Sequence, residues 1–232
     1  MPSLHILSGG AAQGLVTQLR ERFKAEQHCD IAGTFGAVGM MKDQLLAGAA
    51  CDLLILTDAL IAQLTASGQV AAGSAKDLGI VKTGVAVKSG EKAVDVSSPA
   101  ALKAALQAAS GIYFPDPIKA TAGIHVMKVI RELGLEAELA TRLRPFPNGA
   151  AAMKAMAEAN EPSVLGCTQA TEIIFTPGVD LIAPLPKAFE LATIYSAAVC
   201  TQSSQASKAR ALIDLMVSAD VAALRRDCGF EV

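Results

Sequence analysis

Aromatic and charged residues are scarce in this sequence. Its 232 residues include no tryptophan and two tyrosines, and charged residues make up 18% of the chain, whereas 52% of it is hydrophobic. The core must therefore consist of small and aliphatic side chains, and a disordered or fibrous chain is excluded. Twenty Lys and Arg residues stand against 22 Asp and Glu residues. The chain thus lacks the basic excess that is typical of nucleic-acid binding.

Long uncharged runs are also absent. The most apolar stretch, residues 45–64, is interrupted by Asp52 and Asp58, whereas a membrane-spanning helix needs about twenty nearly uncharged residues. Residues 1–7 contain neither a basic segment nor the apolar segment and cleavage site of an export signal. We expect no membrane insertion, and a cytoplasmic protein as the sequence stands, or a periplasmic one if an upstream signal peptide has been removed.

The sequence contains no familiar metal or cofactor motif. Its five cysteines are scattered and form neither a CxxC pair nor a Cys/His cluster that suits zinc. The glycine pair at residues 9–10 is not part of a GxGxxG fingerprint, and no P-loop occurs. We expect no cofactor and no metal, and we expect the cysteines to be reduced, buried thiols.

Apolar periodicity divides the first part of the chain into three strand–helix units. Strands are expected at residues 4–7, 29–35 and 52–56, and helices at 11–26, 40–46 and 59–67. The continuous apolar run 52–56 is typical of a parallel strand that helices cover on both faces. This succession predicts an α/β lobe.

A longer strand at residues 78–87 leaves this lobe, and a second α/β lobe follows. Its expected elements are helix 100–109, strand 111–114, helices 118–133 and 150–160, and strand 163–167. The proline-rich, weakly patterned stretch 179–193 crosses back to strand 195–200 and the final helices 204–217 and 219–228. We predict an α/β fold of two lobes, each a mixed sheet flanked by helices, with two crossing strands as the hinge. Lobe I comprises residues 1–80 and 194–232, and lobe II comprises residues 81–193.

Four strand-to-helix turns carry glycine or polar residues, namely residues 8–11, 35–39, 116–121 and 168–169. Helix N-termini have unpaired N–H groups and a partial positive charge, so several of them aimed at one point bind an anion. Ligands of open α/β sheets bind beyond the carboxyl ends of the strands. Each turn taken alone is an ordinary connection, but together the four predict an anion site in the cleft between the lobes.

Several stretches, taken in order, resemble one protein family. They are residues 52–58 (DLLILTD), Asp116-Pro117 with residues 121–124 (TAGI), residues 132–134 (ELG), Asn160-Glu161 before Leu165-Gly166, and residues 228–230 (CGF). In this order they look like the molybdate-binding type of bacterial solute-binding protein. The resemblance covers nearly the whole chain and implies a type II periplasmic-binding-protein fold. In that family the lobes close over a small oxyanion held by hydroxyls and backbone amides.

The sequence departs from that family where its hydroxyl groups are expected. Gly10 stands close to the place of the usual first-turn serine, with Ser8 two residues earlier, and residues 36–39 read Gly-Ala-Val-Gly where the family is serine-rich. Gln169 stands where the family has a tyrosine. Backbone amides and a few side chains are left as donors, and this set fits a different anion, such as a carboxylate, better than molybdate. The expected ligand-binding residues are Ser8, Gly9, Gly10, Val38, Gly39, Lys119, Thr121, Asn148 and Gln169.

Three of the polar side chains have two interpretations each. Lys119 is either the counter-charge of the ligand or a solvated surface residue. His125 lies one helical turn after Thr121. It is either a functional residue, which hydrogen-bonds the ligand or shuttles a proton, or a partly buried helix residue. Glu172 is either a general base or the cap of a helix.

Two functions follow from these residues. The first is a binding protein for a small anion, expected to be a monomer, which hands its ligand to an ABC transporter permease if it is exported, or acts as a sensor. The second is an isomerase of a small unsaturated tricarboxylate of the aconitate type, since a fold does not define a function. Isomerisation requires donors that stabilise an enolate-like charge and one acid/base group, which Lys119, His125 or Glu172 would supply.

Overall fold

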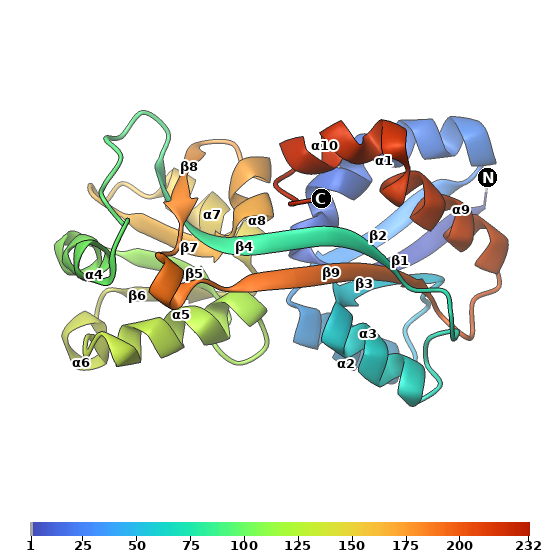
Figure 1. Cartoon of the computed structure of the whole chain (residues 1–232), viewed down its shortest axis with the longest axis horizontal. Helices are drawn as coiled ribbons and strands as arrows, with labels where there is room; N and C mark the ends of the chain where they lie inside the picture. Colours follow the sequence, from blue (N-terminus) through green and yellow to red (C-terminus); the bar gives the residue numbers. More distant parts are fainter. Residues whose placement is uncertain (1) are drawn as a thin grey trace. The chain divides into compact units, whose positions relative to one another are not determined.

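The structure is a computed structural model that describes residues 2–232. The chain forms two compact units, of which the first contains the residues up to Val81 together with Thr193–Val232 and the second contains Lys82–Ala192. Strand β4 (Lys76–Lys88) begins in the first unit and ends in the second, and strand β9 (Ala192–Val199) begins where the chain returns (Figure 1).

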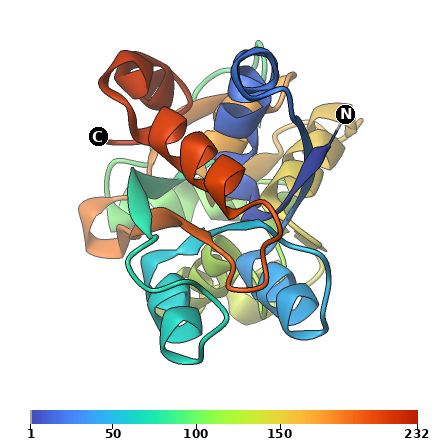
Figure 2. The same cartoon turned by 90° about the vertical axis from the view of Figure 1, so that its right-hand side faces the viewer.

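The first unit confirms the three predicted strand–helix units. Its elements are β1 (Ser3–Gly9), the 3-10 helix η1 (Gly10–Ala12), α1 (Gln13–Gln27), β2 (Asp30–Gly36), α2 (Val38–Leu46), β3 (Leu53–Thr57), α3 (Asp58–Ala66), β9, α9 (Ala206–Val217), η3 (Ala219–Val221) and α10 (Ala222–Asp227). The strand order is β2-β1-β3-β9; β1 is parallel to β2 and β3, and β9 is antiparallel to β3. Helices α1 and α9 cover one face of this sheet, and α2 and α3 cover the other (Figure 2).

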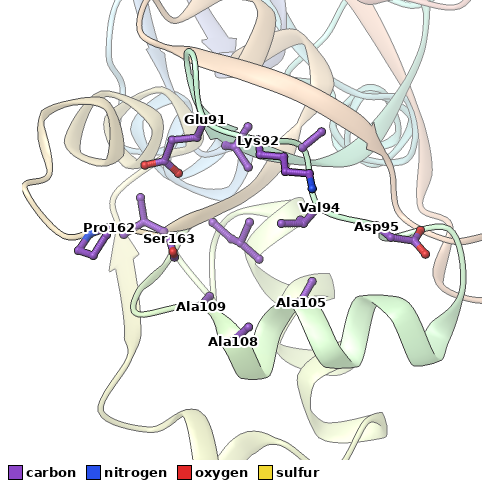
Figure 3. Close-up of a pocket in the computed structure, with 13 residues that line it drawn as sticks. Glu91, Lys92, Val94, Asp95, Ala105, Ala108, Ala109, Pro162 and Ser163 are labelled. Atoms are coloured by element: carbon purple, nitrogen blue, oxygen red, sulfur yellow. The ribbon is translucent and has the colours of Figure 1, made fainter.

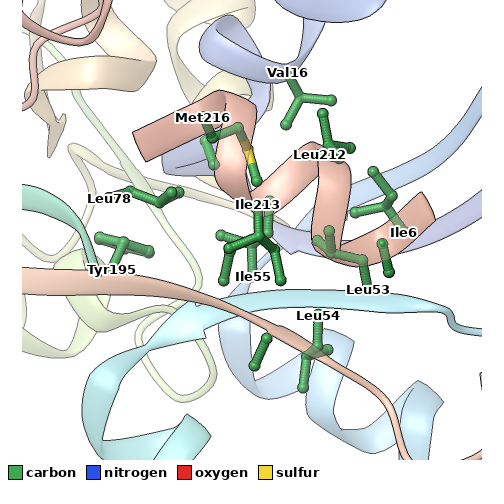
Figure 4. Packing of buried hydrophobic residues seen from close by; sticks show 14 of the residues in the cluster. Ile6, Val16, Leu53, Leu54, Ile55, Leu78, Tyr195, Leu212, Ile213 and Met216 are labelled. Carbon is green, nitrogen blue, oxygen red and sulfur yellow. The ribbon is translucent and has the colours of Figure 1, made fainter. Parts of the chain in front are cut away.

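Strand β3 is central to the core of the first unit. All five of its residues are buried, as expected for a parallel strand with helices on both faces. Leu53 and Ile55 face helix α9, where Leu212 and Met216 are buried, and Leu54 points to the opposite face (Figure 4). Alternation along the strand therefore supplies side chains to both layers of helices.

The second unit contains three parallel strands and two antiparallel ones. Its elements are the second part of β4, α4 (Pro99–Ala108), β5 (Ile112–Pro115), α5 (Thr121–Glu132), α6 (Glu136–Leu139), β6 (Leu143–Phe146), α7 (Gly149–Glu158), β7 (Leu165–Gln169), α8 (Ala170–Phe175), β8 (Val179–Pro184) and η2 (Lys187–Phe189). The strand order is β4-β7-β5-β6, with β8 paired to β4. Strand β5 is parallel to β6 and β7, whereas β4 is antiparallel to β7 and β8.

Alternating side chains divide this second sheet between two hydrophobic clusters. Ile112 and Phe114 pack with residues of α4 and α5 on one face. Tyr113, between them, packs with Met153 of α7 and Ile173 of α8 on the other face. Strand β5 is thus covered by helices on both sides.

The structure differs from the sequence-based expectation at several places, among them the short helix α6, which was not predicted. The helix expected from residue 118 begins at Thr121, because the Asp116 carboxylate accepts the N–H groups of Ile118 (2.7 Å) and Lys119 (2.8 Å) and holds a turn there. Strand β6 was not predicted, since its four residues, LRPF, include Arg144 and Pro145 and form no apolar run. Strand β8 lies in the stretch that was expected to be a crossing segment; it pairs with β4 alone, and an outer strand needs little apolar patterning.

We expect Leu212→Ala to lower the free energy of unfolding by about 2–5 kcal/mol, because it removes a fully buried side chain between α9 and the sheet. Urea denaturation followed by circular dichroism measures the change. Leu46→Ala is the matched control, since Leu46 is 55% exposed. Equal losses in the two variants would contradict the proposed packing.

Candidate functional site

In the first unit the turns after β1 and β2 lie side by side. Gly9 and Gly36 occupy the same position in the parallel register of these strands. A Cβ atom on Gly9 would lie 2.9 Å from Val38 Cγ1 and 3.1 Å from Tyr195 Cε1. Only glycine fits this approach without displacing a neighbour, so the start of α2 and the buried ring of Tyr195 pack directly on the first turn.

The helices that follow these two turns begin without a side-chain cap. The N-cap residues are Gly9 for η1, Ala12 for α1 and Ala37 for α2, and none provides a capping hydrogen bond. By contrast, Thr57 Oγ1 accepts the Leu60 N–H (3.4 Å) at the start of α3. Val38 and Gly39 form the first turn of α2, where the positive end of the helix dipole lies.

Ser8 has an internal role in the structure. Its side chain is fully buried and its hydroxyl donates to the Gly9 carbonyl (2.8 Å). This hydrogen bond holds the turn in which Gly9 and Gly10 lie. The first turn therefore offers mainly backbone groups to a ligand.

In the second unit α5 also begins without a side-chain cap, at N-cap residue Ala120. A Cβ atom on Gly123 would lie 2.2 Å from the Asp116 carbonyl oxygen and 2.3 Å from that of Pro115. This glycine lets the helix start pack against the end of β5. The close approach explains why the TAGI stretch contains glycine at this position. The Lys119 side chain is exposed and Thr121 is half-buried at this helix start.

The start of α7 is occupied by the protein's own side chains. Thr168 donates its hydroxyl to Glu172 Oε2 (2.5 Å), and the N–H groups of Gly149 and Ala150 donate to the same carboxyl group. A Cβ atom on Gly149 would lie 1.9 Å from Glu172 Oε2, so glycine is required there. Asn148 Oδ1 accepts the Ala151 N–H (2.8 Å) and caps the helix.

Glu172 therefore has the capping role, since its carboxyl group is engaged by the Thr168 hydroxyl and by the N–H groups at the start of α7. The residue is 6% exposed, and burial raises the pKa of its carboxyl group, while the Thr168 hydroxyl and the backbone N–H groups oppose this rise. The helix that it caps is α7, whose start lies far from Glu172 in the sequence. The predicted donor Asn148 caps the same helix.

Helix α8 has no side-chain cap, and the first turn of this helix contains an unpaired hydroxyl. Its N-cap residue Gln169 is buried, and the Thr83 hydroxyl lies 3.5 Å from Gln169 Oε1. Thr171, in the first turn, is 3% exposed and its Oγ1 has no hydrogen-bond partner within residues 2–232. A buried hydroxyl without a partner is costly unless a ligand or water satisfies it.

His125 is half-buried and bonded within its own unit. Its Nε2 atom lies 2.8 Å from the Phe189 carbonyl oxygen. Because a carbonyl oxygen only accepts, Nε2 is assigned as the protonated nitrogen. The contact holds the His125 ring against η2.

The distribution of caps agrees with the turns selected from the sequence. Within the described part of the chain, six strands lie parallel to a neighbour, namely β1, β2, β3, β5, β6 and β7. The helices after β3 and β6 are capped by side chains, whereas those after β1, β2, β5 and β7 are not. These four are the turns in which the predicted ligand donors lie, apart from Asn148.

Two residues that the sequence analysis did not select join these turns. Tyr195 comes from β9, which follows the whole second unit in the chain, so no local pattern indicated its contact with Gly9. Thr171 lies in α8, just after the predicted turn 168–169. A threonine two residues after the end of an apolar strand was the available signal for it.

A cavity of about 600 Å³ lies elsewhere in the second unit, between the loop after β4 and helix α4. Small apolar side chains, among them Ala105 and Ala108, line its floor, and Glu91, Lys92 and Asp95 lie on the loop above it (Figure 3). None of the predicted ligand donors lines this cavity. Its volume alone does not make it the candidate site.

No helix within residues 2–232 is long and apolar enough to cross a membrane. In the same part of the chain, no group of three or more His, Cys, Asp or Glu side chains is placed to hold a metal ion.

Comparisons with known proteins match nearly the whole chain. Residues 4–231 match the family described as bacterial extracellular solute-binding protein. An aconitate isomerase from Pseudomonas sp. is 26% identical over 238 residues, covering 99% of this chain and 87% of the relative.

Solved structures of low sequence identity share the fold. The periplasmic molybdate-binding protein of Azotobacter vinelandii is 18% identical, with a TM-score of 0.82 and 99% of both chains covered. The sulfate-binding protein SubI of Mycobacterium tuberculosis is 16% identical, with a TM-score of 0.74, covering 99% of this chain and 86% of that protein. These likenesses confirm the predicted type II periplasmic-binding-protein fold, and the chain belongs to the bacterial extracellular solute-binding protein family.

Proposed function

We propose that this protein binds a small anion, an oxyanion or a carboxylate, at helix starts that lack a side-chain cap. The observation that carries this proposal is the distribution of caps. Side chains of the protein cap the starts of α3 and α7, whereas the helix starts after β1, β2, β5 and β7 have no side-chain cap. Uncapped helix starts offer N–H donors and a partial positive charge to an anion. Because the formal net charge is −2, the attraction must be local.

Carboxylates fit the available donors better than a compact oxyanion does. The Ser8 hydroxyl is engaged with the Gly9 carbonyl, so the first unit offers backbone N–H groups rather than a set of hydroxyls. In the second unit Lys119, Thr121 and Thr171 add one positive charge and two hydroxyls around uncapped helix starts. Such donors form charge-assisted hydrogen bonds with carboxylate oxygens.

A transporter is the partner that this binding role implies. The family is one of extracellular solute-binding proteins, and we propose that an exported form delivers its anion to an ABC transporter permease. A thermal-shift panel of molybdate, tungstate, sulfate, phosphate and di- and tricarboxylates identifies the ligand, since a bound ligand stabilises the folded state.

We expect Ala37→Asp to weaken anion binding at least about tenfold. The new carboxylate caps α2, adds about 1 kcal/mol of stability and occupies the N–H groups that the proposal assigns to the ligand. Isothermal titration calorimetry with the best anion of the panel measures the change in affinity. Ser98→Asp adds the same charge at the start of α4, which is already capped, and is the control. Unchanged affinity in Ala37→Asp would rule out the start of α2 as part of the site.

We expect Thr171→Val to lower the affinity about five- to tenfold without lowering the unfolding midpoint. The Thr171 hydroxyl has no partner to lose in the ligand-free protein, and valine keeps its shape. Thr176→Val is the control, because the Thr176 hydroxyl donates to the Glu172 carbonyl (2.7 Å) and its removal affects stability instead. A stable Thr171→Val variant with full affinity would exclude this hydroxyl from the site.

A second candidate function is isomerisation of an unsaturated tricarboxylate, which the aconitate isomerase relative favours. The reaction removes a proton next to a carboxylate and returns it at the other end of the allylic system. Uncapped helix starts would stabilise the enolate-like charge. Glu172 is engaged at the start of α7, and His125 Nε2 is engaged with the Phe189 carbonyl. Lys119 and the other ring nitrogen of His125 therefore remain as the acid/base candidates.

We expect an isomerase to convert trans-aconitate into its cis isomer, and NMR spectroscopy follows the conversion directly. Lys119→Ala or His125→Gln then lowers the rate about 100-fold or more, the usual size of an acid/base contribution. Lys128→Ala is the matched control on α5, the helix that contains His125 and follows Lys119, since Lys128 is exposed and pairs with Glu132. Binding of trans-aconitate with no product formed leaves the anion-binding role and removes the isomerase.

A further inference from the structure

We propose that Cys51 and Cys200 form a reactive dithiol site that a small-molecule disulfide oxidises to an intramolecular disulfide. The site lies wholly within the first unit. It involves none of the predicted ligand donors, so it is independent of the anion-binding proposal.

The two sulfur atoms already lie next to each other. The Cys200 thiol donates to Cys51 Sγ at 3.3 Å, and the Cys51 thiol is 3.2 Å from the Leu53 carbonyl oxygen. A disulfide bond is about 2.05 Å long, so the sulfur atoms must approach by little more than 1 Å. The two residues are 149 positions apart in the chain, and the sequence spacing gave no sign of the pairing.

The backbone on both sides of the pair is held firmly. The Cys200 N–H donates to the Asp52 carbonyl oxygen (3.0 Å), beside the antiparallel pairing of β3 with β9. The Asp52 carboxylate accepts the His5 N–H (2.9 Å) and the Ser203 hydroxyl (2.7 Å). These hydrogen bonds hold the chain before β3 and the chain after β9 in place, so the thiol contact belongs to the fold of this unit.

A pocket of about 330 Å³ gives access to the pair. Cys51 and Cys200 both line it, together with His5, Gln69, Gln202 and Ser204. Its lining contains both apolar and amide groups. Glutathione, a small peptide whose disulfide is a suitable oxidant, carries groups of the same kinds. The expectation that all five cysteines are buried is wrong for Cys51 and Cys228, which are only partly buried.

The two thiols differ in reactivity. The hydrogen bond from Cys200 lowers the pKa of Cys51, whereas the same partner and burial raise the pKa of Cys200. Burial raises the pKa of Cys167 to about 12 and also raises that of Cys228. Because the thiolate is the attacking species, Cys51 is the first nucleophile and Cys200 is the resolving thiol.

The reaction consists of two exchange steps. The Cys51 thiolate attacks one sulfur of the disulfide RSSR, forms Cys51–S–S–R and releases RS⁻. Cys200 then loses its proton and attacks the Cys51 sulfur, which forms the Cys51–Cys200 disulfide and releases the second RS⁻. The two protons of the protein thiols end on the two RS⁻ ions, so RSSR is reduced to two RSH as the protein pair is oxidised.

The test uses the full, folded and fully reduced chain with glutathione disulfide as the oxidant. We expect loss of two of the five thiols and of two hydrogen masses, with peptide mapping under non-reducing conditions giving a Cys51–Cys200 crosslink. The Cys200→Ser variant stops at one glutathione bound to Cys51. The Cys51→Ser variant reacts at least about tenfold more slowly, because it has lost the nucleophile.

Cys228→Ser is the control, since Cys228 is also partly exposed but does not belong to the hydrogen-bonded thiol pair. This variant must form the same crosslink as the unchanged protein. Five unreacted thiols, a crosslink between any other pair, or a glutathione on Cys228 in place of Cys51 would overturn the proposal.

Discussion

Unsatisfied backbone N–H groups at the starts of helices are the constraint on which the candidate site depends. Each helix leaves its first N–H groups without intrahelical partners, and a fold of strand–helix units places many such starts at the carboxyl ends of parallel strands. The protein satisfies them in two ways. Thr57 and Asn148 cap α3 and α7 from within the chain, whereas α2 and α5 begin at alanines that cannot do so.

The start of α7 shows how the protein fills an anion site by itself. Glu172 accepts hydrogen bonds from the Thr168 hydroxyl and from backbone N–H groups of the helix start, and Gly149 leaves room for the carboxylate. The same physical chemistry that would bind a ligand here binds a side chain instead. The contrast with the uncapped starts of α2 and α5 is what makes those starts candidates for a ligand.

Much of the fold was predictable from periodicity, and the reasons for the exceptions are physical. The continuous apolar run of β3 and the helical spacing of α1 indicated buried, parallel strand–helix units, and the structure contains them. Strand β8 was missed because it lies outside β4 and needs little apolar patterning. Helix α5 begins three residues later than expected, because the Asp116 side chain holds a turn first.

The fold class, the resemblance to the family and the turns that carry candidate donors were predictable from the sequence, since strand periodicity, glycines and the order of motifs are local properties of the chain. Which of these groups are engaged depends on contacts that form only when the chain folds. It paired Glu172 with the start of α7, placed Tyr195 on Gly9 and brought Cys51 to Cys200. Each of these contacts joins residues that are distant in sequence, and no local pattern encodes which distant partner a side chain meets.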